Sequence, residues 1–148
     1  ARPVLEGGRS LLAAVRQVQQ EAAWASELAV LLSDLPYLTP AELAEALAEP
    51  GPVVAAPSAS DGGTNLLVRR PPAAIPARFG RDSFAKHRWA ARRAGLALTE
   101  VRRPGLEQDL DRPEDLVRLI RSGREGRTLS ACTRMGLRLR LLLDAAEG

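Results

Sequence analysis

Two aspartates separated by one residue, Asp109 and Asp111, are the side chains of this sequence most suited to binding a metal ion. In an extended segment, residues i and i+2 project to the same side, which would place the two carboxylates next to each other. Two unit charges about 4 Å apart repel by roughly 4 kcal/mol at an effective dielectric constant near 20. A hard divalent cation such as Mg²⁺, an arginine or full solvation must offset this repulsion. The alternative is an exposed loop in which Asp111 only caps a helix that begins at Pro113.

A third acid, Asp34, closely follows the apolar run 28–32, which is typical of a strand buried on both faces. Ligands of open α/β sheets bind in the crevice beyond the carboxyl ends of the strands. We therefore expect Asp34 at this edge, although a turn that leads into the next helix also accounts for an aspartate here. If Asp34, Asp109 and Asp111 converge, three carboxylates share one crevice and a cation is needed between them.

Two segments are suited to binding an anion. The turn 62–65 (Gly-Gly-Thr-Asn) lets the backbone approach a ligand closely, and Thr64 offers a hydroxyl donor. The segment 80–83 begins a helix, where free backbone N–H groups, the helix dipole and Ser83 favour a phosphate. The alternatives are a plain turn and ordinary helix capping. His87 lies on the same helical face as Ser83, either donating to a phosphate or simply packed.

Strand and helix signals alternate along the chain and predict the elements that position these residues. Helices are expected over 10–25, 39–49, 82–94, 113–121 and 127–143, the last hinged at Gly136, and strands over 28–32, 53–56, 66–68, 96–101 and 107–110. This alternation is typical of an α/β fold with a mostly parallel sheet and helices on both faces. No internal repeat or second domain is visible, so we expect one domain over 1–148.

Composition limits the class of protein. With 148 residues the chain is long enough to bury a core, and its only cysteine, Cys132, excludes an internal disulfide. A single cysteine favours a reducing compartment, and the sequence contains no apolar run long enough to cross a bilayer. These features predict a soluble, cytoplasmic protein.

The formal charge of +3 is unevenly distributed, because ten basic residues and only two acids lie between Arg69 and Arg103. Arginine accounts for nearly all of the cations, which a GC-rich genome or an anion-binding surface would each explain. Aromatic residues are only 3% of the chain, too few for a surface on which nucleic-acid bases stack. We therefore do not expect nucleic acid or a membrane as a partner.

Taken in order, these segments resemble the 2-phospho-L-lactate and phosphoenolpyruvate guanylyltransferases of deazaflavin coenzyme F420 biosynthesis. The likeness covers about 28–128. The matching residues are Asp34-Leu35-Pro36, Leu38-Thr39-Pro40, Gly63-Thr64-Asn65, Phe79-Gly80, Ser83-Phe84, His87 and Asp109-Leu110-Asp111 with Pro113, Asp115 and Leu116.

The resemblance implies a Rossmann-like nucleotidyltransferase fold and an enzyme that uses GTP and Mg²⁺. It implies that Mg²⁺ is held by the catalytic residues Asp34, Asp109 and Asp111. It also implies that the phosphate of a phosphorylated three-carbon acid is bound by Thr64, Gly80 and Ser83. That phosphate attacks the α-phosphorus of GTP and diphosphate leaves, a reaction that requires alignment and charge neutralisation rather than a covalent nucleophile.

The sequence departs from the family where the nucleotide binds. Relatives begin with a strand and a basic loop that have no counterpart before Ala1, and they often carry G-L-N-A where this chain has Gly8-Arg9-Ser10-Leu11. Relatives also tend to carry Asp-Arg in place of Ser58-Ala59. We therefore expect an N-terminally truncated domain with weak GTP binding and an apolar sheet edge.

The sequence leaves several alternatives open. One is a catalytically inactive remnant or partner-binding domain of the same fold, and another is nucleic-acid binding through the arginine-rich stretch 69–103. The choice among phosphorylated acids also stays open, as does assembly into a homo-oligomer.

Overall fold

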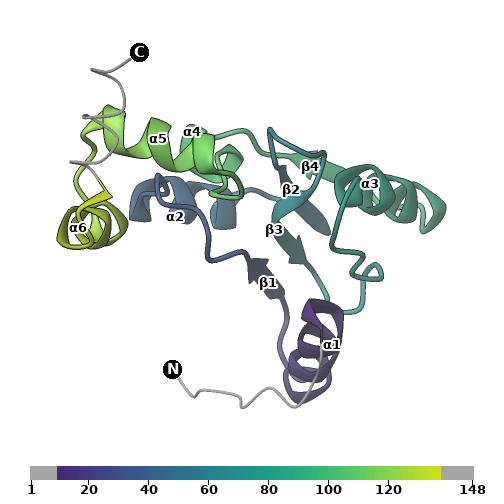
Figure 1. The fold of residues 1–148 in the computed structure, drawn as a ribbon. Helices are drawn as coiled ribbons and strands as arrows, with labels where there is room; N and C mark the ends of the chain where they lie inside the picture. The colour runs from purple at the N-terminus through teal and green to yellow at the C-terminus, as the bar shows by residue number, and fades with distance from the viewer. Residues whose placement is uncertain (1–9, 138–148) are drawn as a thin grey trace.

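The computed structural model describes residues 10–137, and a four-stranded sheet in the order β1-β3-β2-β4 lies at its centre (Figure 1). The strands are β1 (Leu28–Leu31), β2 (Val53–Pro57), β3 (Thr64–Arg69) and β4 (Leu98–Glu100). The helices are α1 (Leu11–Glu21), α2 (Pro40–Ala48), α3 (Ser83–Arg93), α4 (Pro104–Glu107), α5 (Pro113–Ser122) and α6 (Arg127–Arg134).

The sheet is mixed. Strands β1 and β2 each pair antiparallel with β3, and only β2 and β4 pair in parallel. Strands β1, β2 and β4 run in the same direction, as the expectation of a mostly parallel sheet requires. The expectation is wrong for the pairings, because β3 runs in the opposite direction and lies between β1 and β2. The reason is the short loop 58–63, because a parallel connection needs a crossover of about a dozen residues or more and this loop can only form a hairpin.

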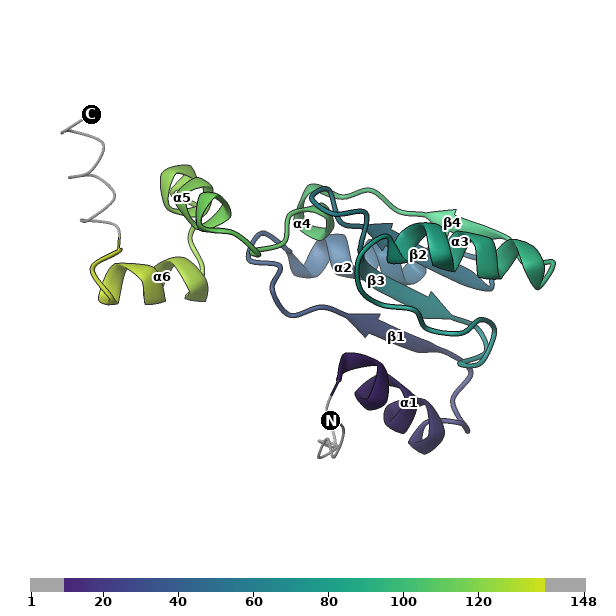
Figure 2. The ribbon, with the colours of Figure 1, turned by 45° about the vertical axis from the view of Figure 1, so that its right-hand side comes forward.

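Helices cover both faces of the sheet, as expected (Figure 2). Val54 and Val68 point to the face that carries α2 and α4, where they pack with Ala46 and Leu106. Their neighbours along the strands point to the opposite face, because side chains of a strand alternate in direction. The members of that second core include Val53, Ala55 and Leu67 from the sheet and Ala90 and Ala91 from α3.

Strand β1 forms one end of the strand order and is only partly covered. Leu28 and Val30 are half-buried, whereas Ala29 and Leu31 are exposed. The prediction that this strand is buried on both faces is therefore wrong. The expected apolar sheet edge is confirmed, since Leu31 keeps 37% of its surface exposed.

Capping groups define several helices as the sequence predicts. At the start of α2 the Thr39 N–H donates to the Glu42 carboxylate (3.0 Å) and the Glu42 N–H donates to the Thr39 hydroxyl (3.2 Å). Helix α5 ends at Gly123, and α6 ends shortly before Gly136; both glycines have positive φ. The remainder of the predicted last helix, 138–143, lies outside the described residues.

The predicted strand 107–110 is absent. Instead, α4 forms a single helical turn that begins at Pro104, a residue favoured in the first turn because it has no N–H to leave unpaired. Asp109 and Asp111 follow α4 in an irregular segment. Within residues 10–137, no helix combines the length and the apolar character that crossing a membrane requires.

Candidate active site

A pocket of about 160 Å³ opens where β1 ends and β3 begins. It brings together five of the six residues that the sequence predicts for the site: Asp34, Thr64, Gly80, Asp109 and Asp111. The sixth, Ser83, lies directly behind the pocket wall, fully buried, and its hydroxyl donates to the Thr64 hydroxyl at 2.9 Å.

Hydrogen bonds place the turn that contains Asp34 beside the segment that contains Asp109 and Asp111. The Leu110 N–H donates to the Asp34 carbonyl at 3.0 Å, which joins the turn after β1 to the segment between Asp109 and Asp111. The Asn65 side-chain amide donates to the Leu106 carbonyl at 2.9 Å and ties α4, which precedes Asp109, to β3. Asp34 and the segment 109–111 are far apart in the sequence. These hydrogen bonds bring them together beside the end of β1 and the start of β3.

The two aspartates of the D-x-D segment have different environments. Asp109 is 7% exposed, and its carboxylate accepts a hydrogen bond from the Ser60 hydroxyl at 3.1 Å. Asp111 is exposed at the rim. Partial desolvation of its carboxyl group raises the pKa of Asp111. A further rise in this pKa comes from neighbouring carboxylates, those of Asp109, Asp34, Asp61 and Asp115.

Asp61 is a site residue that sequence reasoning missed. It lines the same pocket, and its carboxylate accepts a hydrogen bond from the Gly63 N–H at 2.7 Å. This bond forms a tight turn of the kind that aspartate before glycine often makes. An aspartate in Asp-Gly-Gly is therefore first interpreted as a turn residue, and only the return of the chain toward Asp34 reveals its place in the pocket.

The donor set of the pocket suits a hard cation, although the side chains are not gathered around one point. Within residues 10–137, no three His, Cys, Asp or Glu side chains are arranged to hold a metal ion together. Mg²⁺ does not require such a cage, because it is commonly held by one or two carboxylates together with water and substrate phosphates. The shared pocket is confirmed, and Mg²⁺ binding by Asp34, Asp109 and Asp111 stays a prediction.

A second part of the pocket lining, the donor wall, contains Thr64 and Gly80, which offer hydrogen-bond donors. Gly80 has a φ of 110°, which glycine adopts readily, and its N–H has no partner among the described residues. The prediction of free N–H groups at the start of α3 is wrong for three of them. Asp82 donates its N–H to the Asp61 carbonyl at 3.4 Å. Ser83 donates its N–H to the Gly80 carbonyl, and Phe84 donates its N–H to the Gly62 carbonyl.

His87 is fully buried behind this wall and is packed rather than exposed to the pocket. Its Nδ1 lies 3.0 Å from the Thr64 hydroxyl, and its Nε2 accepts a hydrogen bond from the Arg78 N–H at 2.8 Å. Burial lowers the pKa of His87 to about 4, with further lowering by the positive charges of Arg69, Arg78 and Lys86. The ring is therefore neutral near pH 7.

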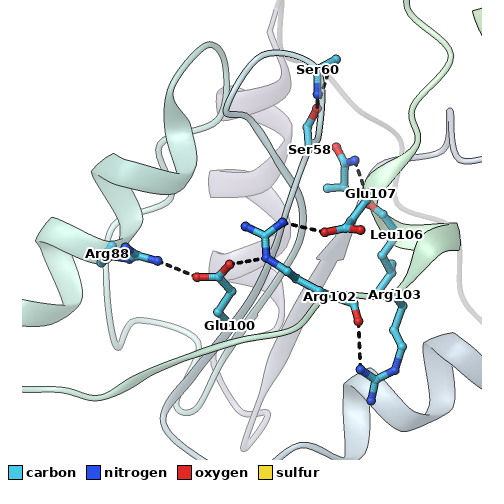
Figure 3. Close-up of polar contacts among 9 residues, drawn as sticks. Ser58, Ser60, Arg88, Glu100, Arg102, Arg103, Leu106 and Glu107 are labelled. Atoms are coloured by element: carbon cyan, nitrogen blue, oxygen red, sulfur yellow. Dashed lines mark hydrogen bonds and ion pairs between the residues drawn. The ribbon is translucent and has the colours of Figure 1, made fainter.

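Much of the arginine-rich stretch 69–103 is paired with acids. Figure 3 shows a chain of ion pairs that runs from Arg88 to Glu100 and on through Arg102 to Glu107. This chain joins α3, β4 and α4. Arg70 forms an ion pair with Glu27. These cations connect elements of the fold and do not form one free basic surface.

The fold is shared with a protein of known structure. A protein from Desulfovibrio desulfuricans G20, assigned as a nucleotide-diphospho-sugar transferase, superposes with a TM-score of 0.72 at 21% sequence identity. The match covers 90% of this chain and 62% of that protein. The sheet and its helices therefore share the fold of that protein, which is consistent with a nucleotidyltransferase-like fold.

The family follows from sequence comparison. The model of the family described as "Guanylyl transferase CofC like" matches residues 2–144, and the chain belongs to this family. Phosphoenolpyruvate guanylyltransferase of Rubrobacter xylanophilus is 43% identical over 122 residues, 80% of this chain and 56% of the relative. The 2-phospho-L-lactate guanylyltransferase of Haloferax volcanii is 40% identical over 112 residues, 76% of this chain and 53% of the relative. The chain thus spans little more than half the length of these curated relatives.

Proposed function

We propose that this chain forms the acceptor-binding part of a cytoplasmic, GTP-dependent guanylyltransferase. The reaction transfers GMP from GTP to a phosphorylated three-carbon acid and releases diphosphate, in the biosynthesis of deazaflavin coenzyme F420. Membership of the family and the names of the relatives support this reaction. The observation that carries the proposal is the pocket, which is lined both by carboxylates and by residues that offer hydrogen-bond donors.

The donor wall suits the phosphate of the acid. Thr64 and Gly80 line the pocket and offer a hydroxyl and an N–H, and hydrogen bonds from such groups to an anionic oxygen are stronger than those between neutral groups. Bound in this way, the acceptor phosphate keeps one oxygen free to attack. The reaction forms a bond from that oxygen to the α-phosphorus of GTP. The bond from the α-phosphorus to the bridging oxygen breaks, and its electron pair leaves with diphosphate.

The carboxylate side suits the charges that develop during transfer. Asp34, Asp109 and Asp111 would hold Mg²⁺, which when bound neutralises phosphate oxygens of the reacting groups. The pKa of Asp111 is raised by desolvation first and then by the neighbouring carboxylates, which a bound cation would offset. No side-chain nucleophile is required, because the acceptor phosphate itself attacks.

The acceptor remains a choice among chemically similar acids. Relatives are named for phosphoenolpyruvate, 2-phospho-L-lactate and, in Phenylobacterium zucineum, 3-phospho-D-glycerate. All three carry a phosphate and a carboxylate on three carbons. We propose phosphoenolpyruvate or 2-phospho-L-lactate, because the most similar of the matches named above act on these two.

Calorimetric titration of the chain with each acid, in the presence of Mg²⁺, tests the acceptor site directly. We expect one of the acids to bind and Thr64→Val to weaken that binding. Thr99→Val is a matched control, since Thr99 lies on β4 and its hydroxyl bonds to the Pro50 carbonyl outside the pocket. Binding of none of the acids would contradict the proposal.

A further inference from the structure

The hydrogen bonds of His87 determine which of its ring nitrogens carries the proton. Nε2 accepts a hydrogen bond from the Arg78 N–H through its lone pair, so this nitrogen carries no hydrogen. A neutral imidazole has one N–H, which must then be on Nδ1. The nitrogen that faces Thr64 is therefore a donor, and the Thr64 oxygen accepts from it at 3.0 Å.

The Thr64 hydroxyl receives a second hydrogen bond from the other side. The Ser83 hydroxyl donates to the same oxygen at 2.9 Å. A hydroxyl oxygen has two lone pairs and one hydrogen, so two incoming donors occupy both lone pairs. The hydrogen of Thr64 must point elsewhere. No acceptor for it lies among the described residues, and Thr64 lines the pocket.

We propose that His87 is a positioning residue: together with Ser83 it turns the Thr64 hydroxyl so that its hydrogen is always presented to an anionic oxygen in the pocket. The phosphorylated acid as the source of that oxygen rests on the proposed function. Thr64 is thereby a fixed donor whose orientation is set before the ligand arrives, which removes part of the ordering cost of binding.

The same arrangement assigns opposite roles to the two sides of the pocket. An oxygen whose lone pairs are both engaged cannot coordinate a cation, so Thr64 serves the phosphate and leaves metal binding to the carboxylates. Burial keeps this network free of competing water, since Thr64, Ser83 and His87 are each 2% exposed or less. The arrangement also explains a buried polar cluster at a place where apolar side chains would otherwise fill the core.

Two matched substitutions separate the donor role of His87 from its packing role. In His87→Asn the side-chain amide NH₂ takes the place of Nδ1–H and can still donate to Thr64. In His87→Gln the amide oxygen takes the place of Nε2 and keeps the Arg78 N–H bonded, but the donor to Thr64 is lost. We expect His87→Gln to weaken phosphoenolpyruvate binding roughly tenfold to a hundredfold, and His87→Asn to retain most of the affinity.

A double-mutant cycle gives the sharper result. If His87 acts through Thr64, His87→Gln costs nothing further in a Thr64→Val background, because the hydroxyl that it orients is already gone. Nitrogen NMR of the labelled His87 ring shows, without any ligand, which ring nitrogen carries the proton. It should show a protonated Nδ1 and an unprotonated Nε2 from pH 5 to pH 7, which lies above the lowered pKa of about 4.

A protonated Nε2, additive losses in the cycle, or equal losses in His87→Asn and His87→Gln would each overturn the proposal. If His87→Gln does not fold, the ring nitrogens and His87→Asn still decide it. If the unsubstituted chain binds no phosphoenolpyruvate, the proposed function is contradicted. The role of His87 is then decided by the NMR measurement alone.

Discussion

The two walls of the pocket differ in how far they are organised in advance. On the donor wall, Thr64, Ser83 and His87 are buried and joined by hydrogen bonds of 2.9 to 3.0 Å. On the acidic wall, Asp34 and Asp111 are exposed, and the pKa of Asp111 is raised by partial desolvation and then by neighbouring carboxylates. A buried network can be fixed by the fold alone, whereas clustered carboxylates need an added charge to become stable. We infer that the phosphate side is preformed and that the acidic side is completed by its cation.

The largest expected effect concerns pH and the donor wall. The pKa of His87 is about 4 in the folded chain against 6.5 for an ordinary histidine, so the unfolded chain binds a proton that the folded chain excludes. The stability from the neutral ring is full above pH 6.5 and is lost as the pH falls toward 4. At about 1.4 kcal/mol per pKa unit, the loss approaches 3 kcal/mol.

Urea unfolding between pH 7 and pH 4 measures this loss, with His87→Asn as the comparison because asparagine does not titrate. The difference in unfolding free energy between the two chains should shrink steadily on acidification. A constant difference across this range would show that His87 is not held neutral by burial.

The next effect concerns Thr64. Thr64→Val leaves the His87 and Ser83 donors buried without an acceptor, and an unpaired buried polar group costs about 1–3 kcal/mol. Thermal or urea unfolding should show this loss, and Thr99→Val should lose less because Thr99 is only half-buried. Equal stability of Thr64→Val and the unsubstituted chain would mean that the network contributes nothing.

Mg²⁺ should produce a smaller effect on the acidic wall. At a concentration ten times its dissociation constant, a ligand that binds only the folded chain adds about 1.4 kcal/mol of stability. We expect Mg²⁺ to raise the melting temperature of the unsubstituted chain but not that of a chain carrying both Asp34→Asn and Asp109→Asn. Glu114→Gln, an exposed change on α5, serves as the control. The same Mg²⁺ response in the double variant would place any cation elsewhere.

The smallest effect is expected for Asp111→Asn without Mg²⁺. The raised pKa of Asp111 means that its charged carboxylate is disfavoured in the folded chain. The protonated group therefore contributes stability below the pKa of the unfolded chain, and this contribution is lost as the pH rises through the pKa of the folded chain. Removing the charge should therefore stabilise the chain slightly at pH 7. Because Asp111 is exposed, the gain is a few tenths of a kcal/mol at most. A measurable loss of stability at pH 7 would show that desolvation and the neighbouring carboxylates do not disfavour the charged Asp111.

The sequence predicted well what is encoded locally. The Thr39 capping box, the glycine after α5 and the i, i+4 relation of Ser83 and His87 depend on residues close in the chain, and the structure has all of them. The sequence also placed Asp34, Asp109 and Asp111 near the sheet edge at which ligands of α/β folds bind, and the three residues line one pocket there. Their side chains are not gathered around one point among the described residues.

What the sequence could not give depends on distant contacts. The antiparallel position of β3 follows from pairing partners rather than from the composition of the strand. The helical turn of α4 replaces the predicted strand, and its Leu106 carbonyl accepts a hydrogen bond from the distant Asn65 amide on β3. Arg69 is buried, and desolvation lowers its pKa. The sequence did not predict this burial, because Arg69 was considered only as one charge of the basic stretch 69–103. Asp61 was missed because the local sequence predicts only its turn. Its position in the pocket depends on residues distant in the chain.

A crystal structure of the chain grown with phosphoenolpyruvate and Mn²⁺, which replaces Mg²⁺ and is located by its anomalous scattering, tests the division of the pocket most directly. The account predicts a phosphate oxygen within hydrogen-bond distance of the Thr64 hydroxyl and the Gly80 N–H, and the metal bound to oxygens of Asp34, Asp109 or Asp111. A phosphate bound away from Thr64, or a metal remote from all three aspartates, would contradict it.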